Sequence, residues 1–233
     1  MTPTLDTFLT EFAAMLDGRR TAREVESVLG PSPSGTARLG LYATLVQRQQ
    51  TGAIDEFYAA VRVAAPSGYY EPLRNAYLEA YPPSHWAPAR AAEHFPVFLE
   101  ARKSSIELVE LADFAWTRHL VLNAEATDAL VVRHYTHAVK RFSNEVERDG
   151  RTRGRPEKDA ETWLMGRSLL DGNLVMVEPS VAALVTVEVL HSGGWSDELP
   201  AIPRGVLLKE AERLIELGLL PPTSRAVLER LVP

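Results

Sequence analysis

The chain of 233 residues contains no cysteine, which excludes disulfides, thiolate metal sites, iron–sulfur clusters and a cysteine nucleophile together. No apolar run approaches the roughly 20 residues needed to span a bilayer. The N-terminal residues MTPTLDTFLTEF carry neither a positive n-region nor an apolar h-region, so we expect no signal peptide. The sequence therefore predicts a soluble, cytoplasmic protein with no membrane partner.

An excess of positive charge is also missing. The formal net charge is −6, which disfavours a polyanionic partner unless basic residues gather on one face. The best basic cluster lies in the polar, Gly- and Pro-containing segment 148–161, where acidic residues interleave with it. A nearly neutral segment supplies few net phosphate contacts, so we expect a loop or a mobile linker there and regard nucleic acid as an unlikely partner. The basic residues are Arg148, Arg151, Arg153, Arg155 and Lys158.

Catalytic motifs are absent as well: the sequence has no G-x-S-x-G, P-loop, H-E-x-x-H or G-x-G-x-x-G pattern. His134 and His137 lie three apart in VVRHYTHAVKRF, a stretch rich in β-branched and aromatic residues that favours a strand. On a strand, residues an odd number apart point to opposite faces and cannot chelate one ion. We therefore expect no metal and no catalytic residue, although a triad or carboxylate pair assembled in space stays open.

The first half of the chain has the periodicity of helices. LDTFLTEFAAMLDG places Phe8, Phe12 and Leu16 four residues apart, and GPSPSG at 30–35 can only be a loop. In the long helical segment that follows, the residues suited to buried stripes are Leu41, Leu45, Ile54, Phe57 and Val61. Further helical segments predict a bundle domain over residues 1–125.

The segment YPPSHWAPARAAEHFPVFLEAR is punctuated by prolines and rich in large apolar side chains. It could be a crossover whose aromatic side chains fill the core. It could also present a surface to a partner protein, since Trp and Arg are favoured interface anchors. The candidate partner-binding residues are Trp86, Arg90, Phe95 and Arg102.

The second half, residues 126–233, changes character. After the strand near 131–142, TWLMGRS and NLVMVEPS flank LLDG, which predicts a β-hairpin. Ser180 can cap a helix that Gly193 ends, and a clear amphipathic helix follows at 206–219. Strand, hairpin and helices are the content of a small winged-helix-like domain, so the predicted fold class is α+β.

The order of segments in residues 5–125 resembles the N-terminal domain of HvfC/BufC-type proteins. The resemblance rests on Tyr42 in the long helix, on Tyr69 and Tyr70 before a Tyr-containing helix, and on the Pro82-Pro83 break. It continues through FPVFL and the ELADFAW helix. Ala43 stands where the family often has Arg and Ala92 where it often has Gly, so the chain resembles a divergent member.

The resemblance implies a partner role rather than catalysis. Such proteins resemble the companions of multinuclear non-heme iron oxidases, which modify ribosomally made precursor peptides. The companion would bind the leader of the precursor peptide and dock it to the oxidase. Iron is then expected in the partner enzyme, and no cofactor in this chain. The C-terminal domain would be the peptide-recognition element.

A short sheet beside an amphipathic helix suits that role, because an extended peptide can join the sheet as an added strand. The edge would come from Leu174, Val175, Met176 and Val177. About half of the residues in the groove wall are expected to be core residues instead. The wall residues are Leu207, Leu208, Ala211, Leu214 and Ile215.

The alternative is a DNA-binding transcriptional regulator that places the helix at 206–219 in a major groove. That helix carries Lys209 and Arg213, but also Glu210, Glu212 and Glu216. Because acids outnumber bases, phosphates would repel it. The adaptor hypothesis is therefore preferred to the regulator, and the regulator to an enzyme.

Overall fold

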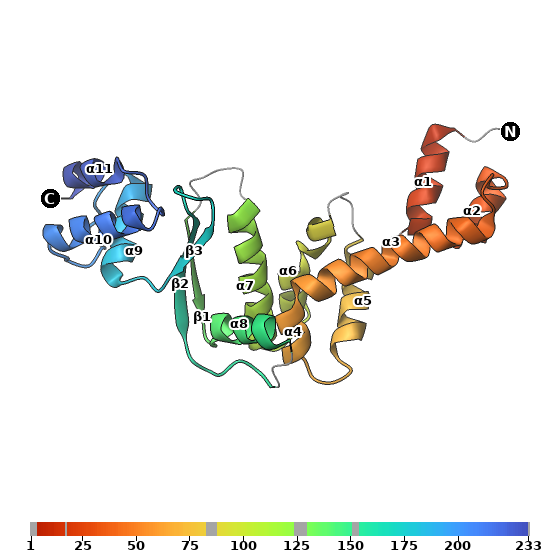
Figure 1. Cartoon of the computed structure of the whole chain (residues 1–233), viewed down its shortest axis with the longest axis horizontal. Coiled ribbons are helices and arrows are strands. Elements are labelled where there is room, and N and C mark those ends of the chain that lie inside the picture. The colour runs from red at the N-terminus through yellow and green to blue at the C-terminus, as the bar shows by residue number, and fades with distance from the viewer. Residues whose placement is uncertain (1–3, 17, 83–87, 124–129, 151–153, 233) are drawn as a thin grey trace. The chain divides into compact units, whose positions relative to one another are not determined.

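The fold is α+β, as the sequence predicts: helices accompany one three-stranded antiparallel sheet (Figure 1). The structure is a computed structural model. It describes residues 4–16, 18–82, 88–123, 130–150 and 154–232.

The chain divides into two compact units. The first comprises residues 1–112 and 142–155, and the second comprises residues 113–141 and 156–233. The predicted domains met at a single boundary near residue 125. The observed division differs because the chain passes between the units more than once.

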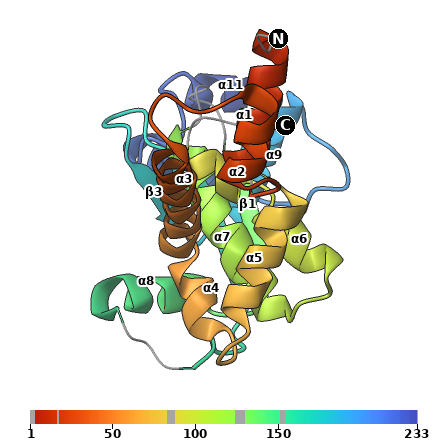
Figure 2. The same ribbon diagram turned by 90° about the vertical axis from the view of Figure 1, so that its right-hand side faces the viewer.

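Three helices open the first unit: α1 (Leu5–Leu16), α2 (Ala22–Leu29) and α3 (Thr36–Phe57). The helices α1 and α2 lie beside the N-terminal part of α3 (Figures 1 and 2). A capping box starts α2, in which the Thr21 N–H donates to the Glu24 carboxylate at 2.7 Å and the Thr21 hydroxyl accepts the Glu24 N–H at 3.3 Å. This cap explains why α2 begins sharply after the turn.

Buried Met15, Val25 and Ala43 hold these three helices together. The predicted burial is confirmed for Ile54 and Val61, which are fully buried. It is wrong for Leu41 and Leu45 on α3, since these side chains are 58% and 52% exposed. The sequence pattern places them on one side of α3, but α1 and α2 cover a different side. An apolar face of α3 is therefore left in contact with solvent.

The other elements of the first unit are further α-helices and one 3₁₀ helix, η1. The elements are α4 (Ala59–Ala64), α5 (Tyr70–Ala80), η1 (Pro88–Ala92), α6 (Phe95–Ala101), the first part of α7 (Ile106–Asn123) and the last part of α8 (Val139–Asp149).

The second unit contains the sheet, with strand order β1-β2-β3. The predicted hairpin is confirmed, and so are the Ser180 cap and the Gly193 end of the helix that follows it. Its elements, besides parts of α7 and α8, are β1 (Val131–Tyr135), β2 (Glu161–Arg167), β3 (Leu174–Val177), α9 (Val181–Ser192), α10 (Arg204–Glu216) and α11 (Ser224–Leu231).

The helix α8 lies where the sequence predicted a strand followed by a loop. Its buried residues Val139, Phe142 and Val146 recur at helical spacing, and this signal was outweighed by the β-branched residues just before them. The helix α11 was also missed, and its Leu228 is buried against α9 and α10.

One face of the sheet packs on α9 and α10 through a buried cluster that we call the sheet cluster. The tip of the β2–β3 hairpin is held beside it, because the Leu169 N–H donates to the Gly218 carbonyl at 2.8 Å. The sheet cluster comprises Leu164, Ala183, Leu214, Leu219 and Leu220.

Gly218→Ala should destabilise the second unit. Gly218 has φ +73°, and a Cβ there would lie 2.6 Å from the Ser168 hydroxyl and 3.2 Å from the Leu169 nitrogen. The left-handed backbone alone costs an alanine about 1 kcal/mol. The clash with the hairpin should add roughly 1–2 kcal/mol, as overpacking does. Urea denaturation measures the loss.

Gly193→Ala is the matched control, because Gly193 ends α9 with φ +74° and its Cβ would meet no atom within 4 Å. Its free energy of unfolding should fall only by the roughly 1 kcal/mol that the left-handed backbone costs an alanine. Equal losses in the two variants would contradict the packing of the hairpin on Gly218.

Candidate functional site

Strand β3 lies at one edge of the sheet. In the described part of the chain, β2 is the strand that pairs with it, in a register that sets Val177 opposite Leu164 and Met176 opposite Met165. The other edge of β3 therefore carries backbone groups that no strand satisfies. An edge of this kind is a template for pairing with another chain.

The register determines which residues of β3 face the open edge. In antiparallel pairs, residues that exchange hydrogen bonds alternate with residues that do not. The Ser168 N–H donates to the Asn173 carbonyl at 2.8 Å, so these two form a hydrogen-bonded pair. Two positions on, Val175 turns its backbone groups toward β2. Leu174 and Met176 turn their N–H and C=O groups toward the open edge.

The hairpin turn fixes this register. Gly172 adopts φ +74°, which favours glycine, and the Asn173 N–H donates to Asp171 Oδ1 at 3.1 Å. The Leu170 N–H donates to the Ser168 hydroxyl at 3.2 Å. The hydrogen bond from the Asn173 N–H holds the pKa of Asp171 below its ordinary value. A slip of one residue would break these bonds and turn every side chain of β3 to the other face.

The two faces of β3 have different surroundings. Val175 and Val177 are partly buried against the sheet cluster, on the side of α9 and α10. Leu174 and Met176 alternate with them and point to the opposite face, where they are half-buried. The four predicted edge residues therefore all lie on the open edge strand, two with side chains on each face of the sheet.

The structure places three residues of the predicted groove wall in the core. Leu207 and Ala211 are fully buried where α9, α10 and α11 meet, and Leu214 is fully buried in the sheet cluster. These three belong to the inward stripe of α10 and cannot line a groove. Leu208 and Ile215 are partly buried beside them and remain accessible.

A polar group lies on the same face as Met176. The Lys140 ammonium sits 3.7 Å from the centroid of the Trp163 ring, and the Trp163 indole N–H donates to Glu161 Oε2 at 2.5 Å. Partial burial lowers the pKa of Lys140, and the charges of Glu161 and Glu178 oppose that shift. No motif in the sequence indicates this group, because Lys140 and Trp163 are far apart in the sequence and come together only in the folded unit.

An ion pair on this face ties β1 to α7. Arg133 Nε lies 3.2 Å from Asp113 Oδ2, and the Tyr135 hydroxyl donates to the same oxygen at 2.9 Å. Burial, together with the Asp113 charge, raises the pKa of Tyr135. The Phe114 ring packs edge-on against Tyr135, with the ring centroids 5.9 Å apart.

The two histidines of the opening strand lie in different settings. His134, on β1, has a ring nitrogen 2.9 Å from the Thr162 hydroxyl, and His137 follows the end of the strand. Within residues 4–16, 18–82, 88–123, 130–150 and 154–232, no group of three His, Asp or Glu side chains could hold a metal ion. The absence of a metal or cofactor in this chain stays a prediction.

Of the predicted partner-binding residues, Phe95 is fully buried, which corrects its assignment to an exposed surface. The centroid of its ring lies 4.6 Å from the ring centroid of Tyr58 and 5.0 Å from that of Tyr77. The Tyr58 and Tyr77 hydroxyls each donate at 2.6 Å to a carbonyl of η1. Phe95 and Phe98 of this segment therefore fill a core, and Trp86 lies outside the described residues.

Arg90 and Arg102 are exposed, as a partner surface would require. Arg90 pairs with Glu93 at 3.3 Å, and the Arg102 guanidinium lies 5.0 Å from the centroid of the Phe98 ring. Both could reach a partner without disturbing the core.

The basic segment near 148–161 is partly neutralised by local pairs. Arg148 pairs with Asp149 at 2.8 Å, and Arg155 pairs with the buried Glu107 at 2.9 Å. Arg151 and Arg153 lie outside the described residues.

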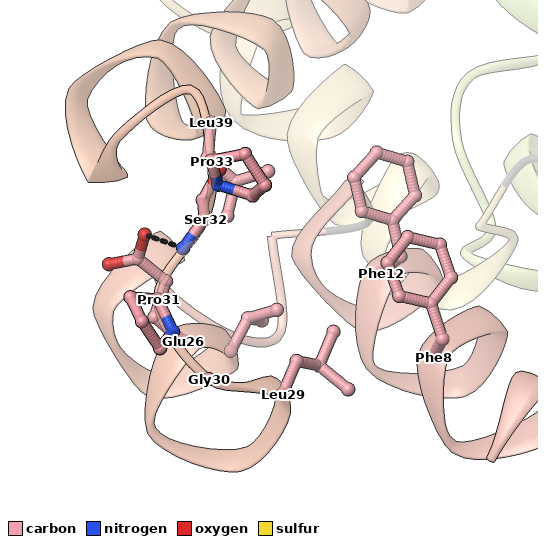
Figure 3. A pocket seen from close by; sticks show the side chains of 10 residues that line it. Phe8, Phe12, Glu26, Leu29, Gly30, Pro31, Ser32, Pro33 and Leu39 are labelled. Carbon is pink, nitrogen blue, oxygen red and sulfur yellow. Dashed lines mark hydrogen bonds between the residues drawn. The ribbon is translucent and has the colours of Figure 1, made fainter. Parts of the chain in front are cut away.

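The described residues of the first unit line at least two cavities. One, of about 240 Å³, is mostly apolar and lies where α1, α2 and the start of α3 meet (Figure 3). The other, of about 610 Å³, is lined mainly by residues of α3 and α5, and its polar side chains include Gln47, Gln50, Asn75 and Glu79. Neither brings together a nucleophile, a general base and an oxyanion donor.

Comparisons with known proteins find no family model that matches the chain and no match among curated proteins. None of the described helices combines the length and the hydropathy that crossing a bilayer requires.

Buried tyrosines should make the protein sensitive to alkali. Burial raises the pKa of Tyr77 to about 12, and also raises the pKa of Tyr70. In the unfolded chain a tyrosine ionises near pH 10. The stabilisation is therefore complete below about pH 10 and is lost as the pH rises toward 12. Urea denaturation between pH 8 and 11.5 measures this decline.

The variant Tyr77→Phe tests whether Tyr77 contributes to the loss of stability at alkaline pH. It should cost about 1 kcal/mol at pH 8, because the hydrogen bond to the Ala91 carbonyl is lost. Above pH 10 its stability should fall less steeply than that of the unaltered protein. Identical slopes would show that Tyr77 does not retain its proton in the folded state.

Proposed function

We propose that this chain is a non-catalytic partner protein that binds the leader of a ribosomally made precursor peptide as an added strand on β3. The observation that carries the proposal is the open edge of β3, where Leu174 and Met176 turn their backbone groups outward. Main-chain hydrogen bonds to such an edge supply affinity, and neighbouring side chains supply selectivity.

The two faces of the edge specify what kind of peptide fits. Side chains of an added strand alternate between the faces. On one face they would meet Val175, Val177 and the accessible part of Ile215, which are apolar. On the other they would meet Met176 and the Trp163–Lys140 pair, which offers an aromatic edge and a cation. The leader should therefore carry apolar residues at every second position, with aromatic or polar residues between them, because Glu161 and Glu178 already balance the charge of Lys140.

The energetics suit a leader that binds and then leaves. Four outward N–H and C=O groups on Leu174 and Met176 can contribute about 1 kcal/mol each. Two or three buried apolar anchors add about 2 kcal/mol each. The gross gain of about 8–10 kcal/mol is reduced by the cost of association and of ordering the peptide, so the leader should bind more weakly than the roughly 8 kcal/mol of a micromolar complex.

The resemblance to HvfC/BufC-type proteins supports the rest of the proposal. Under this proposal, the sheet together with α9, α10 and α11 serves as a winged-helix-like peptide-recognition element, and the protein acts in the cytoplasm. The chain docks the bound precursor to a multinuclear non-heme iron oxidase, which holds the iron and performs the oxidation.

The regulator hypothesis has less support. On α10, Arg213 pairs with Glu210, and Glu212 pairs with Arg225 of α11. Because the positive charge of these arginines is already neutralised by carboxylates of their own unit, they would bind DNA phosphates only weakly.

Met176→Pro tests the strand-addition mode directly. The Met176 N–H points to the open edge, so proline removes a donor for the peptide without removing a bond to β2. Binding of the short precursor peptides encoded beside the gene, followed by fluorescence anisotropy, should weaken about tenfold or more relative to Met176→Ala, which lacks the same side chain but keeps the N–H.

Equal affinity of the two variants, with equal melting temperatures, would refute strand addition at β3. Binding of DNA that falls steeply as salt rises would favour the regulator instead.

A further inference from the structure

The N-terminal half of α3 presents an apolar strip to solvent. Leu41, Tyr42 and Leu45 are 58%, 50% and 52% exposed, and Arg38 and Arg48 flank them. Positions 38, 41, 42, 45 and 48 share one side of a helix and span about 15 Å. We call these five residues the α3 stripe.

The α3 stripe is positively charged in a chain whose net charge is −6. Between Glu26 and Asp55 the sequence contains no acidic residue, and Arg38 and Arg48 are its two charged side chains. Within the described residues, neither guanidinium makes a hydrogen bond or an ion pair. The two arginines are therefore available to carboxylates from outside.

The apolar surface continues from the stripe to a cavity. The Tyr42 ring stacks on Phe12 at 5.9 Å, and Phe12 stacks on Phe8 at 5.6 Å. Figure 3 shows Phe8 and Phe12 facing Leu29 across the cavity of about 240 Å³. That volume can take one leucine or phenylalanine side chain, as the anchor pockets of protein interfaces do.

The charges distinguish between possible occupants. If two copies of the chain paired through this stripe about a two-fold axis, antiparallel helices would set Arg38 against Arg48. Parallel helices would set each arginine against its own copy. Both arrangements bring like charges together, which disfavours a homodimer. A partner with carboxylates at both ends of an apolar strip would satisfy the stripe.

We propose that the α3 stripe is the docking surface for an acidic amphipathic helix of a partner protein. The partner helix would lay apolar residues at positions i, i+3, i+4 and i+7 over Leu41, Tyr42 and Leu45. Its Asp or Glu residues would pair with Arg38 and Arg48, as helix-in-groove recognition allows. This inference goes beyond the proposed function, because it does not depend on any peptide bound at β3.

The test is a selection from a phage-displayed library of helix-forming 16-residue peptides on the full chain. Peptides that are recovered should be acidic and amphipathic. Leu41→Ser with Leu45→Ser should weaken their binding at least tenfold, and these half-exposed residues can change without disturbing the core. Arg38→Glu with Arg48→Glu should reverse the preference, so that the same peptides bind better once their Asp and Glu are replaced by Lys.

Two controls locate the effect. Lys209→Glu changes an exposed charge on α10 and should leave binding unaltered. Met176→Pro should also leave it unaltered, so a failure at β3 and a failure at the α3 stripe are distinguishable.

Three outcomes would overturn the proposal. The first is recovery of no peptide, or of peptides that bind equally to the charge-reversed variant. The second is a dimer in sedimentation experiments that Leu45→Ser abolishes. The third is binding to vesicles containing anionic lipid that depends on Arg38 and Arg48.

Discussion

The contact between the sheet and helices α9 and α10 determines the character of the second unit. Leu164 of β2 is fully buried there, so the face of the sheet that carries Leu164 must also carry Val175 and Val177 of β3. Strand periodicity then leaves Leu174 and Met176 on the opposite face, with their backbone groups at the open edge. A buried apolar contact thus decides which backbone groups a bound peptide could meet. The hairpin turn and Gly218 keep that arrangement in register.

Much of this unit could be predicted from the sequence, because its signals are local. Alternating apolar residues on both sides of LLDG indicate a hairpin, and a Ser before an apolar run with a Gly after it indicates a capped helix. The helix α8 was missed because β-branched residues precede it directly. The sequence predicts that about half of the groove-wall residues are core, but it does not show that these are Leu207, Ala211 and Leu214, since periodicity shows which residues share a face and not what covers that face.

The exposed residues of α3 show the converse case, in which a face with the periodicity of a buried face is not covered. Leu41 and Leu45 have the spacing of core residues, yet no element covers them in the described part of the chain. Only the tertiary arrangement of α1 and α2 shows this. With Arg38 and Arg48 at its ends, that uncovered face becomes a surface whose charge and shape specify a partner. The two proposed surfaces therefore use different physics: β3 offers unsatisfied backbone groups, whereas the α3 stripe offers apolar area framed by charge.

Amide hydrogen exchange of β3, measured by NMR with and without a precursor peptide, tests the central claim most directly. In the free protein, the Leu174 and Met176 amides should exchange faster than that of Val175, which is bonded to β2. Bound peptide should slow the exchange of Leu174 and Met176 and leave Val175 nearly unaltered. Contradiction would come from a peptide that binds while the Leu174 and Met176 amides keep their free exchange rates, since the binding site would then lie elsewhere.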